Sequence, residues 1–166
     1  MDLRWRKPRW WLATSLAFVV IAIAAAPAFA HLAPEPSRVE PGASATVAFL
    51  VEHGCDEAPT IELTFQVPKG VKDVEPVDKD GWISDVDGRT VVFEGGPLDA
   101  NTPDTFSISF TAPNKKKIIR WKVVQGCTEG LIRWIDTAVG AEHPPAEIGV
   151  GKDVPTDAGT ESGHSP

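Results

Sequence analysis

The residue with the most distinctive potential chemistry is His31, because of where the chain is expected to be cut. Residues 10–30 carry no charge, follow four basic residues and close with Ala28-Phe29-Ala30. A basic start, an apolar core and a small-x-small end are typical of a secretory signal peptide. We expect cleavage after Ala30, which would make His31 the first mature residue. The alternative is an uncleaved N-terminal anchor, since the run is nearly long enough to span a bilayer.

A histidine at the start of a chain offers two nitrogen donors, the free α-amine and the imidazole Nδ1. Together they can chelate one ion, and such pairs suit Cu(II), which stands highest in the divalent affinity series. The α-amine also has an ordinary pKa of about 8, so it can bind metal near neutral pH. His31 at this position by coincidence is the alternative. A metal would need further ligands, for which the candidates are Glu35, Glu52, His53, His143 and His164.

Glu52 departs from the pattern of the segment that it ends. Residues 45–51 are almost all apolar, which predicts a strand buried on both faces, and Glu52-His53-Gly54-Cys55 follows. A carboxylate at the end of a buried strand either faces solvent or binds a ligand.

Composition limits the kinds of partner. The 166 residues carry 16 Lys+Arg and 23 Asp+Glu, a net charge of −7. Removal of residues 1–30, with four basic residues and Asp2, leaves 136 residues with 12 basic and 22 acidic side chains, a net charge of −10. This balance disfavours nucleic acid and anionic membrane surfaces as partners, and it is compatible with a cation.

Cys55 and Cys127 are the two cysteines of the chain, and both lie in the part expected to be exported. An even pair outside the cytosol favours one disulfide, which would close a loop of about 73 residues. A two-thiolate metal site is the competing interpretation.

The mature chain shows no convincing helix and many short, alternating runs separated by Gly and Pro turns, which predicts an all-β sandwich. In residues 60–67, Ile61, Leu63, Phe65 and Val67 should share the buried face. Asp87-Gly88 indicates a tight hairpin. Clear strands are expected at 45–52, 61–67, 89–94, 105–111, 118–125 and 131–137, and weaker ones at 71–77, 82–86 and 147–150.

The expected organisation is a signal peptide at 1–30, one sandwich domain at 31–151 and a polar tail at 152–166. The tail is rich in Gly, Ser, Thr, Pro and acids and is predicted to be disordered. Trp82, Trp121 and Trp134 remain after cleavage and are expected in the core or on a face of the sandwich.

Several of these features occur together in one order. VEHGCDEAPT at 51–60 is followed by VPKGV at 67–71 and Gly81-Trp82, and then by VVQGC at 123–127, RWID at 133–136 and EHPPA at 142–146. This combination resembles the YcnI-like family, also called DUF1775, over roughly residues 31–150. The chain departs from the family's usual His-Val-Thr start, having His31-Leu32-Ala33. It also ends in a polar tail where many members have a membrane helix, so we expect no membrane span in the mature chain.

The resemblance implies an exported, immunoglobulin-like β-sandwich that handles copper together with other envelope copper proteins, in the periplasm or outside the cell. It implies one Cu(II) bound by a single-histidine brace: His31 supplies amine and imidazole, Glu52 a carboxylate, and Trp134 an indole packed against the metal. It also implies a disulfide between Cys55 and Cys127.

Two other functions compete with a non-enzymatic copper carrier. One is a brace-type copper oxidase or monooxygenase, for which His53 or His143 would have to supply a second imidazole. The other is a metal-free immunoglobulin-like interaction module.

Overall fold

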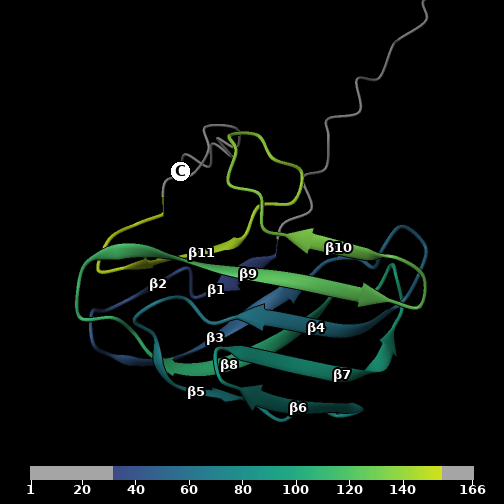
Figure 1. Ribbon diagram of the computed structural model, residues 1–166, viewed down its shortest axis with the longest axis horizontal. Helices are drawn as coiled ribbons and strands as arrows, with labels where there is room; N and C mark the ends of the chain where they lie inside the picture. The colour runs from purple at the N-terminus through teal and green to yellow at the C-terminus, as the bar shows by residue number, and fades with distance from the viewer. Residues whose placement is uncertain (1–31, 155–166) are drawn as a thin grey trace, which may run out of the picture.

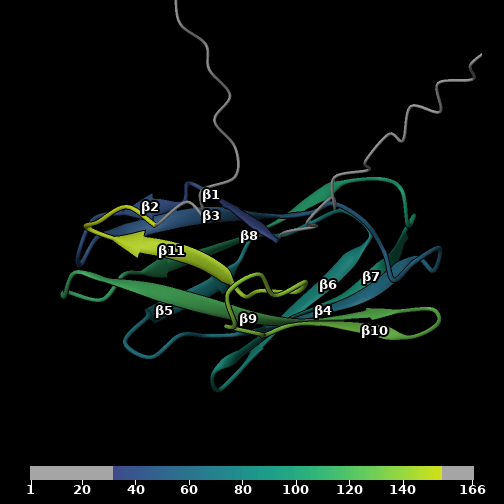
Figure 2. The same cartoon turned by 90° about the horizontal axis from the view of Figure 1, so that it is seen from above.

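The computed structural model describes residues 32–154. Within this range the regular secondary structure consists of β-strands. The predicted all-β sandwich is confirmed: two sheets pack face to face (Figures 1 and 2). Among residues 32–154 there is no helix of the length and apolarity that crossing a membrane requires. The expected signal peptide, His31 and His164 lie outside the described residues, as does the expected tail beyond residue 154.

The smaller sheet has four antiparallel strands in the order β1-β3-β8-β5. Its central strands β3 and β8 pair over their whole length, from Ser44 opposite Thr111 to Val51 opposite Asp104. Alternate side chains of both strands are buried, which is the period-two pattern of a sheet with one face in the core. The prediction that residues 45–51 are buried on both faces is therefore wrong: Val47, Phe49 and Val51 are buried, whereas the residues between them are partly exposed. The four strands are β1 (Ala33–Glu35), β3 (Ser44–Val51), β8 (Asp104–Thr111) and β5 (Lys72–Pro76).

The larger sheet has the order β2-β11-β9-β4-β7-β6, and β10 pairs with β9 beside this path. Strand β9 is the longest, and its outer edge is shared by β11 along one half and β10 along the other. The strands are β2 (Arg38–Val39), β11 (Ala146–Val150), β9 (Lys117–Cys127), β10 (Leu131–Trp134), β4 (Thr60–Gln66), β7 (Thr90–Leu98) and β6 (Trp82–Asp87).

Aromatic rings from both sheets fill the space between them. Trp121 on β9 is fully buried and contacts Phe49 on β3 and Phe110 on β8, with ring centroids 5.5 and 5.3 Å apart. Phe65 on β4 meets Phe49 across the layers at 5.1 Å. Each buried aromatic ring removes a large apolar area from water, so these contacts carry much of the stability of the sandwich.

The predicted buried face of residues 60–67 is wrong at its first position. Ile61 is 39% exposed, whereas Thr60 is fully buried. The register of β4 shifts between Thr60 and Glu62 against both neighbours. Against β9, two steps along β4 oppose one step from Cys127 to Gly126, so Ile61 is the extra residue of a β-bulge. Against β7 the extra residues lie on β7, between Glu94 and Leu98. A bulge changes the alternation by one residue, which turns the hydroxyl of Thr60 inward.

The remaining differences from the predicted strands lie at their ends and at the start of the domain. All nine predicted strands are present with boundaries shifted by a few residues, and the hairpin at Asp87-Gly88 joins β6 to β7. The short strands β1 and β2 were not predicted, because neither contains an alternating run. Strand β2 pairs with β11 in parallel, so the sheet is not purely antiparallel as expected.

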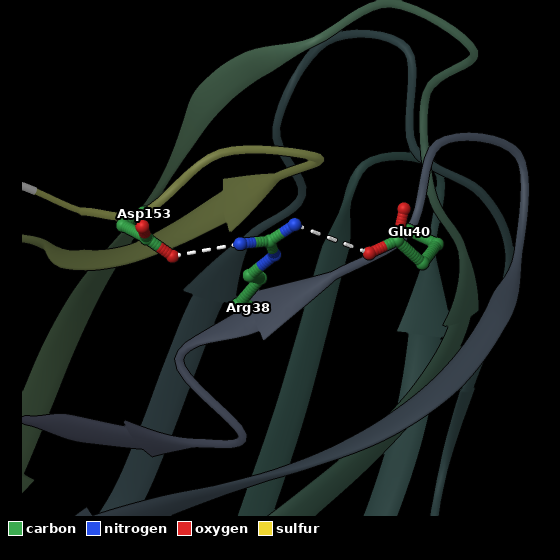
Figure 3. Close-up of polar contacts among 3 residues, drawn as sticks. All are labelled: Arg38, Glu40 and Asp153. Carbon is green, nitrogen blue, oxygen red and sulfur yellow. Dashed lines mark hydrogen bonds and ion pairs between the residues drawn. The ribbon is translucent and has the colours of Figure 1, made fainter.

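An exposed ion-pair group joins the two ends of the described chain. Arg38 on β2 contacts Asp153 at 2.9 Å and Glu40 at 3.4 Å (Figure 3). The hydrogen bond with Asp153 raises the pKa of Arg38 above its ordinary value. Because all three side chains lie at the surface, solvent screens these pairs and they add little to stability. Asp153 belongs to the part predicted as a tail from residue 152, of which the structure describes residues 152–154.

The predicted Cys55–Cys127 disulfide is confirmed, with 6.0 Å between the two Cα atoms. It ties the segment that follows β3 in one sheet to the end of β9 in the other. The bridge therefore fixes how the two sheets meet at this end of the sandwich.

We predict that replacing both cysteines with alanine lowers the free energy of unfolding by about 2–5 kcal/mol, since the unfolded chain loses a long closed loop. Urea unfolding followed by far-ultraviolet circular dichroism measures this loss. Dithiothreitol should destabilise the wild type by a similar amount and leave the double variant unchanged. Equal stability of the oxidised wild type and the variant would contradict the prediction.

Candidate functional site

The segment from Glu52 to Cys55 follows β3 and leads to the disulfide, and its backbone packs closely against neighbouring backbone. The amide of Gly54 donates to the carbonyl of Ala100 at 2.8 Å. A Cβ added at Gly54 would clash with the carbonyl oxygen of Ala58, so no larger residue fits there. The glycine in His53-Gly54-Cys55 is thus required by close backbone approach, and it holds the preceding His53 and Glu52 at the end of β3.

Gln125 on β9 is the hydrogen-bonding centre of this end of the molecule. Its side chain is fully buried. Its Oε1 accepts from the indole Nε1 of Trp134 at 3.0 Å, and its Nε2 donates to the carbonyl of His53 at 2.7 Å and to Oγ1 of Thr60 at 2.8 Å. An indole N–H can only donate, so the amide oxygen of Gln125 has to face Trp134. One side chain therefore ties together β10, β4 and the segment after β3.

Two histidine rings lie close to Trp134. Its ring is 6.0 Å from that of His53 and 5.0 Å from that of His143, centroid to centroid, and the indole is only 3% exposed. Because its N–H is bonded to Gln125, the indole offers its neighbours only its apolar faces and edges. His143 comes from the long segment between β10 and β11, which rises above β9 in Figure 1.

The two histidines differ in the state of their ring nitrogens. Nδ1 of His53 lies 2.6 Å from the carbonyl of Gly54, and because a carbonyl can only accept, Nδ1 is the donor of this hydrogen bond. Nδ1 of His143 is buried and has no hydrogen-bond partner within the described part of the chain. Both rings are half-buried.

The structure brings together some of the predicted site residues. Glu52, His53, Trp134 and the disulfide are at one end of the sandwich, and Gln125 joins the carbonyl of His53 to the indole of Trp134. His143 packs against Trp134 from its own loop. Glu35 is paired with Ala48, farther down the small sheet. Glu52 is exposed. In residues 32–154 alone, no three His, Cys, Asp or Glu side chains are grouped so that they could hold a metal ion.

Gln125 was missed by sequence reasoning, although a signal was present. Residues 119, 121, 123, 125 and 127 alternate along β9 and all face the core. Gln125 is the polar amide among Ile, Trp, Val and Cys on that face. A polar side chain on a buried face needs partners, which was a reason to single it out.

Residues 31–90 match the family described as a domain of unknown function, DUF1775. This segment belongs to the DUF1775 family. The resemblance drawn from the sequence motifs is thereby confirmed over residues 31–90, which include β1, β3 and the Glu52-His53-Gly54-Cys55 segment.

A solved structure supports the expected immunoglobulin-like fold. An uncharacterized protein from Nocardia farcinica with an immunoglobulin-like fold matches 72% of this chain and 97% of its own, with a TM-score of 0.63 and 18% identity. A protein from Corynebacterium diphtheriae, described as membrane anchored, matches 72% of this chain and 33% of its own, with a TM-score of 0.41 and 16% identity. No curated protein matches the sequence.

We predict that Gln125→Leu, which leaves Trp134 Nε1 and the His53 carbonyl without their partner, lowers the free energy of unfolding by about 3 kcal/mol. Thr60→Val removes only one of the three hydrogen bonds and should cost about 1 kcal/mol. Denaturant unfolding measures both losses. In Gln125→Leu the indole N–H resonance of Trp134 should also shift and exchange faster with solvent, and an unmoved resonance would exclude Gln125 as the group that positions Trp134.

Proposed function

We propose that this protein is exported and binds one Cu(II) ion at its mature N-terminus, for copper uptake, storage or delivery. The α-amine and imidazole of His31 and the carboxylate of Glu52 would hold the ion, and Trp134 would lie beside it. The donor set suits this ion, because two nitrogens and a carboxylate oxygen are ligands that tetragonal Cu(II) accepts.

The observation that carries the proposal is the pairing of β1 with β3. Ala33 lies opposite Leu50 in an antiparallel ladder. His31 is two residues before Ala33 and Glu52 is two residues after Leu50, so continuation of the ladder would bring His31 and Glu52 opposite each other. Side chains of directly opposed residues have Cβ atoms about 5 Å apart, close enough for both to bind one ion.

The anchoring of Glu52 also supports the proposal. The carbonyl of the next residue, His53, is bonded to Gln125, and Cys55 is bonded to Cys127. A ligand held on a fixed backbone loses less conformational freedom when a metal binds. Trp134 has its N–H bonded to Gln125, so beside copper it would act as an apolar wall that limits access of water and other ligands.

We expect isothermal titration of the metal-free mature protein with Cu(II) to show one tight site, and one extra residue before His31 to weaken it at least a hundredfold. The extension removes the chelate, because the nitrogen of His31 becomes an amide. Equal affinity of the extended protein would exclude the brace. Mass spectrometry of the exported protein establishes whether His31 is first, and oxygen consumption with ascorbate well above that of free copper would favour an oxidase instead.

Replacement of Glu52 by Ala should weaken Cu(II) binding about tenfold and change the EPR spectrum of the bound ion, since a charged oxygen ligand is lost. Glu75→Ala is the matched control. Glu75 is also an exposed glutamate, but it lies on β5, at the edge of the small sheet opposite β1. An unchanged spectrum in Glu52→Ala would remove this residue from the site.

A further inference from the structure

A groove opens in the larger sheet because β9 is longer than the strand beside it. Strand β4 ends at Gln66, opposite Lys122. On that edge, residues 117–121 have no strand partner in the described structure, while their other edge pairs with β11. The turn after β4 and the tip of the β6–β7 hairpin flank the space that remains, a groove of about 380 Å³.

The groove is strongly basic although the protein is acidic. Five of the twelve Lys and Arg residues that follow residue 30 line it, and no Asp or Glu does. A second surface hollow, beside the disulfide, is lined by Asp56, Glu57 and Glu129 and by no basic residue. The residues of the groove are Gln66, Val67, Pro68, Lys69, Arg89, Lys117, Ile118, Ile119, Arg120 and Lys122.

Most of the positive charge of the groove has no carboxylate to offset it. Arg89 donates to the carbonyl of Val67, and Lys117 donates to the carbonyl of Lys69 at 2.7 Å, so these two side chains are held in place by neutral groups. Only Arg120 is paired with an acid, Glu147 on β11. The side chains of Lys69 and Lys122 make no hydrogen bond or ion pair with any residue of the range 32–154.

We propose that this groove binds a small soluble anion that carries several phosphate charges. Four cations without a carboxylate partner would be neutralised poorly by a single carboxylate and well by a polyphosphate. A guanidinium and several ammonium groups are also the side chains that bind phosphate oxygens most often. The volume is within the range of small-ligand sites.

The lining of the groove favours a soluble anion over a lipid headgroup. Membrane-binding surfaces add exposed apolar side chains to their basic residues. The large exposed apolar residues of the described chain all lie outside the groove lining. They are Ile61, Val77, Ile83, Val86, Leu131, Ile135 and Val139.

The groove is independent of the proposed copper site. It lies at the Lys117 end of β9, whereas Gln125 and Cys127 are at the other end. A strand of this length spans about 30 Å. Anion binding can therefore be measured in metal-free protein, and its outcome does not depend on whether His31 binds copper.

The test is isothermal titration of the metal-free protein with tripolyphosphate at low ionic strength, where surface charges are screened least. The groove variant combines Lys69→Gln with Lys122→Gln. In the described structure neither side chain makes a hydrogen bond or ion pair, so their replacement should not destabilise the fold. The control is Lys72→Gln with Lys115→Gln, two exposed lysines outside the groove whose loss changes the net charge equally.

We expect a single site in the wild type, a loss of affinity of at least tenfold in the groove variant and less than twofold in the control. Equal losses of affinity in both variants would show that the binding is non-specific electrostatic attraction and would overturn the proposal. Absence of binding to the wild type would overturn it as well. Co-sedimentation with vesicles containing phosphatidylglycerol forms the second arm. Vesicle binding that needs Lys69 and Lys122, without binding of tripolyphosphate, would overturn the soluble anion in favour of a lipid headgroup.

Discussion

The backbone of β9 sets the constraint on which both ends of the molecule depend. Each of its buried N–H and C=O groups needs a partner, and no neighbouring strand is long enough to serve all eleven residues. On one edge β11 pairs with the first half and β10 with the second. On the other edge β4 pairs only with residues 122–127. The switch from β11 to β10 forces residues 135–145 into a long connecting loop, and the shortness of β4 opens the basic groove.

Two hollows of opposite charge lie toward the two ends of β9. The disulfide end has exposed carboxylates beside a hollow without basic residues, and the opposite end has a groove without acids. A chain of uniform negative charge would attract cations everywhere and repel anions everywhere. With the charges separated along β9, one domain can attract a metal ion at one end and an anion at the other. Net charge alone, which disfavoured anionic partners, could not reveal this.

The sheet architecture could be predicted from the sequence because alternation and turn residues are local signals. The nine predicted strands and the hairpin at Asp87-Gly88 follow from such signals. The pairing of Cys55 with Cys127 follows from the presence of only two cysteines in the chain. The bulge at Ile61 could not be predicted, since it depends on the register of two neighbouring strands at once. The groove depends on the relative lengths of β4 and β9, and the meeting of His53, Trp134 and His143 depends on the course of a loop. No single segment of the chain determines either of them.

At Gln125 a buried polar side chain takes the place of an apolar one and fixes the relative positions of its hydrogen-bond partners. Its position faces the core, where leucine would fill a similar volume without needing partners. The glutamine needs three, and it finds them in an indole of a neighbouring strand, a hydroxyl beside the bulge and a loop carbonyl. A fully satisfied buried network fixes its members more sharply than apolar contacts do. Here it fixes the indole of Trp134 and the backbone beside Glu52 relative to each other.

The bulge that turns Thr60 inward is part of the same arrangement, because without that hydroxyl one donor of the buried amide would have no acceptor. The irregularity of β4 is thus required by the polar group on β9. Both help to hold the end of the sandwich at which the N-terminal strand begins.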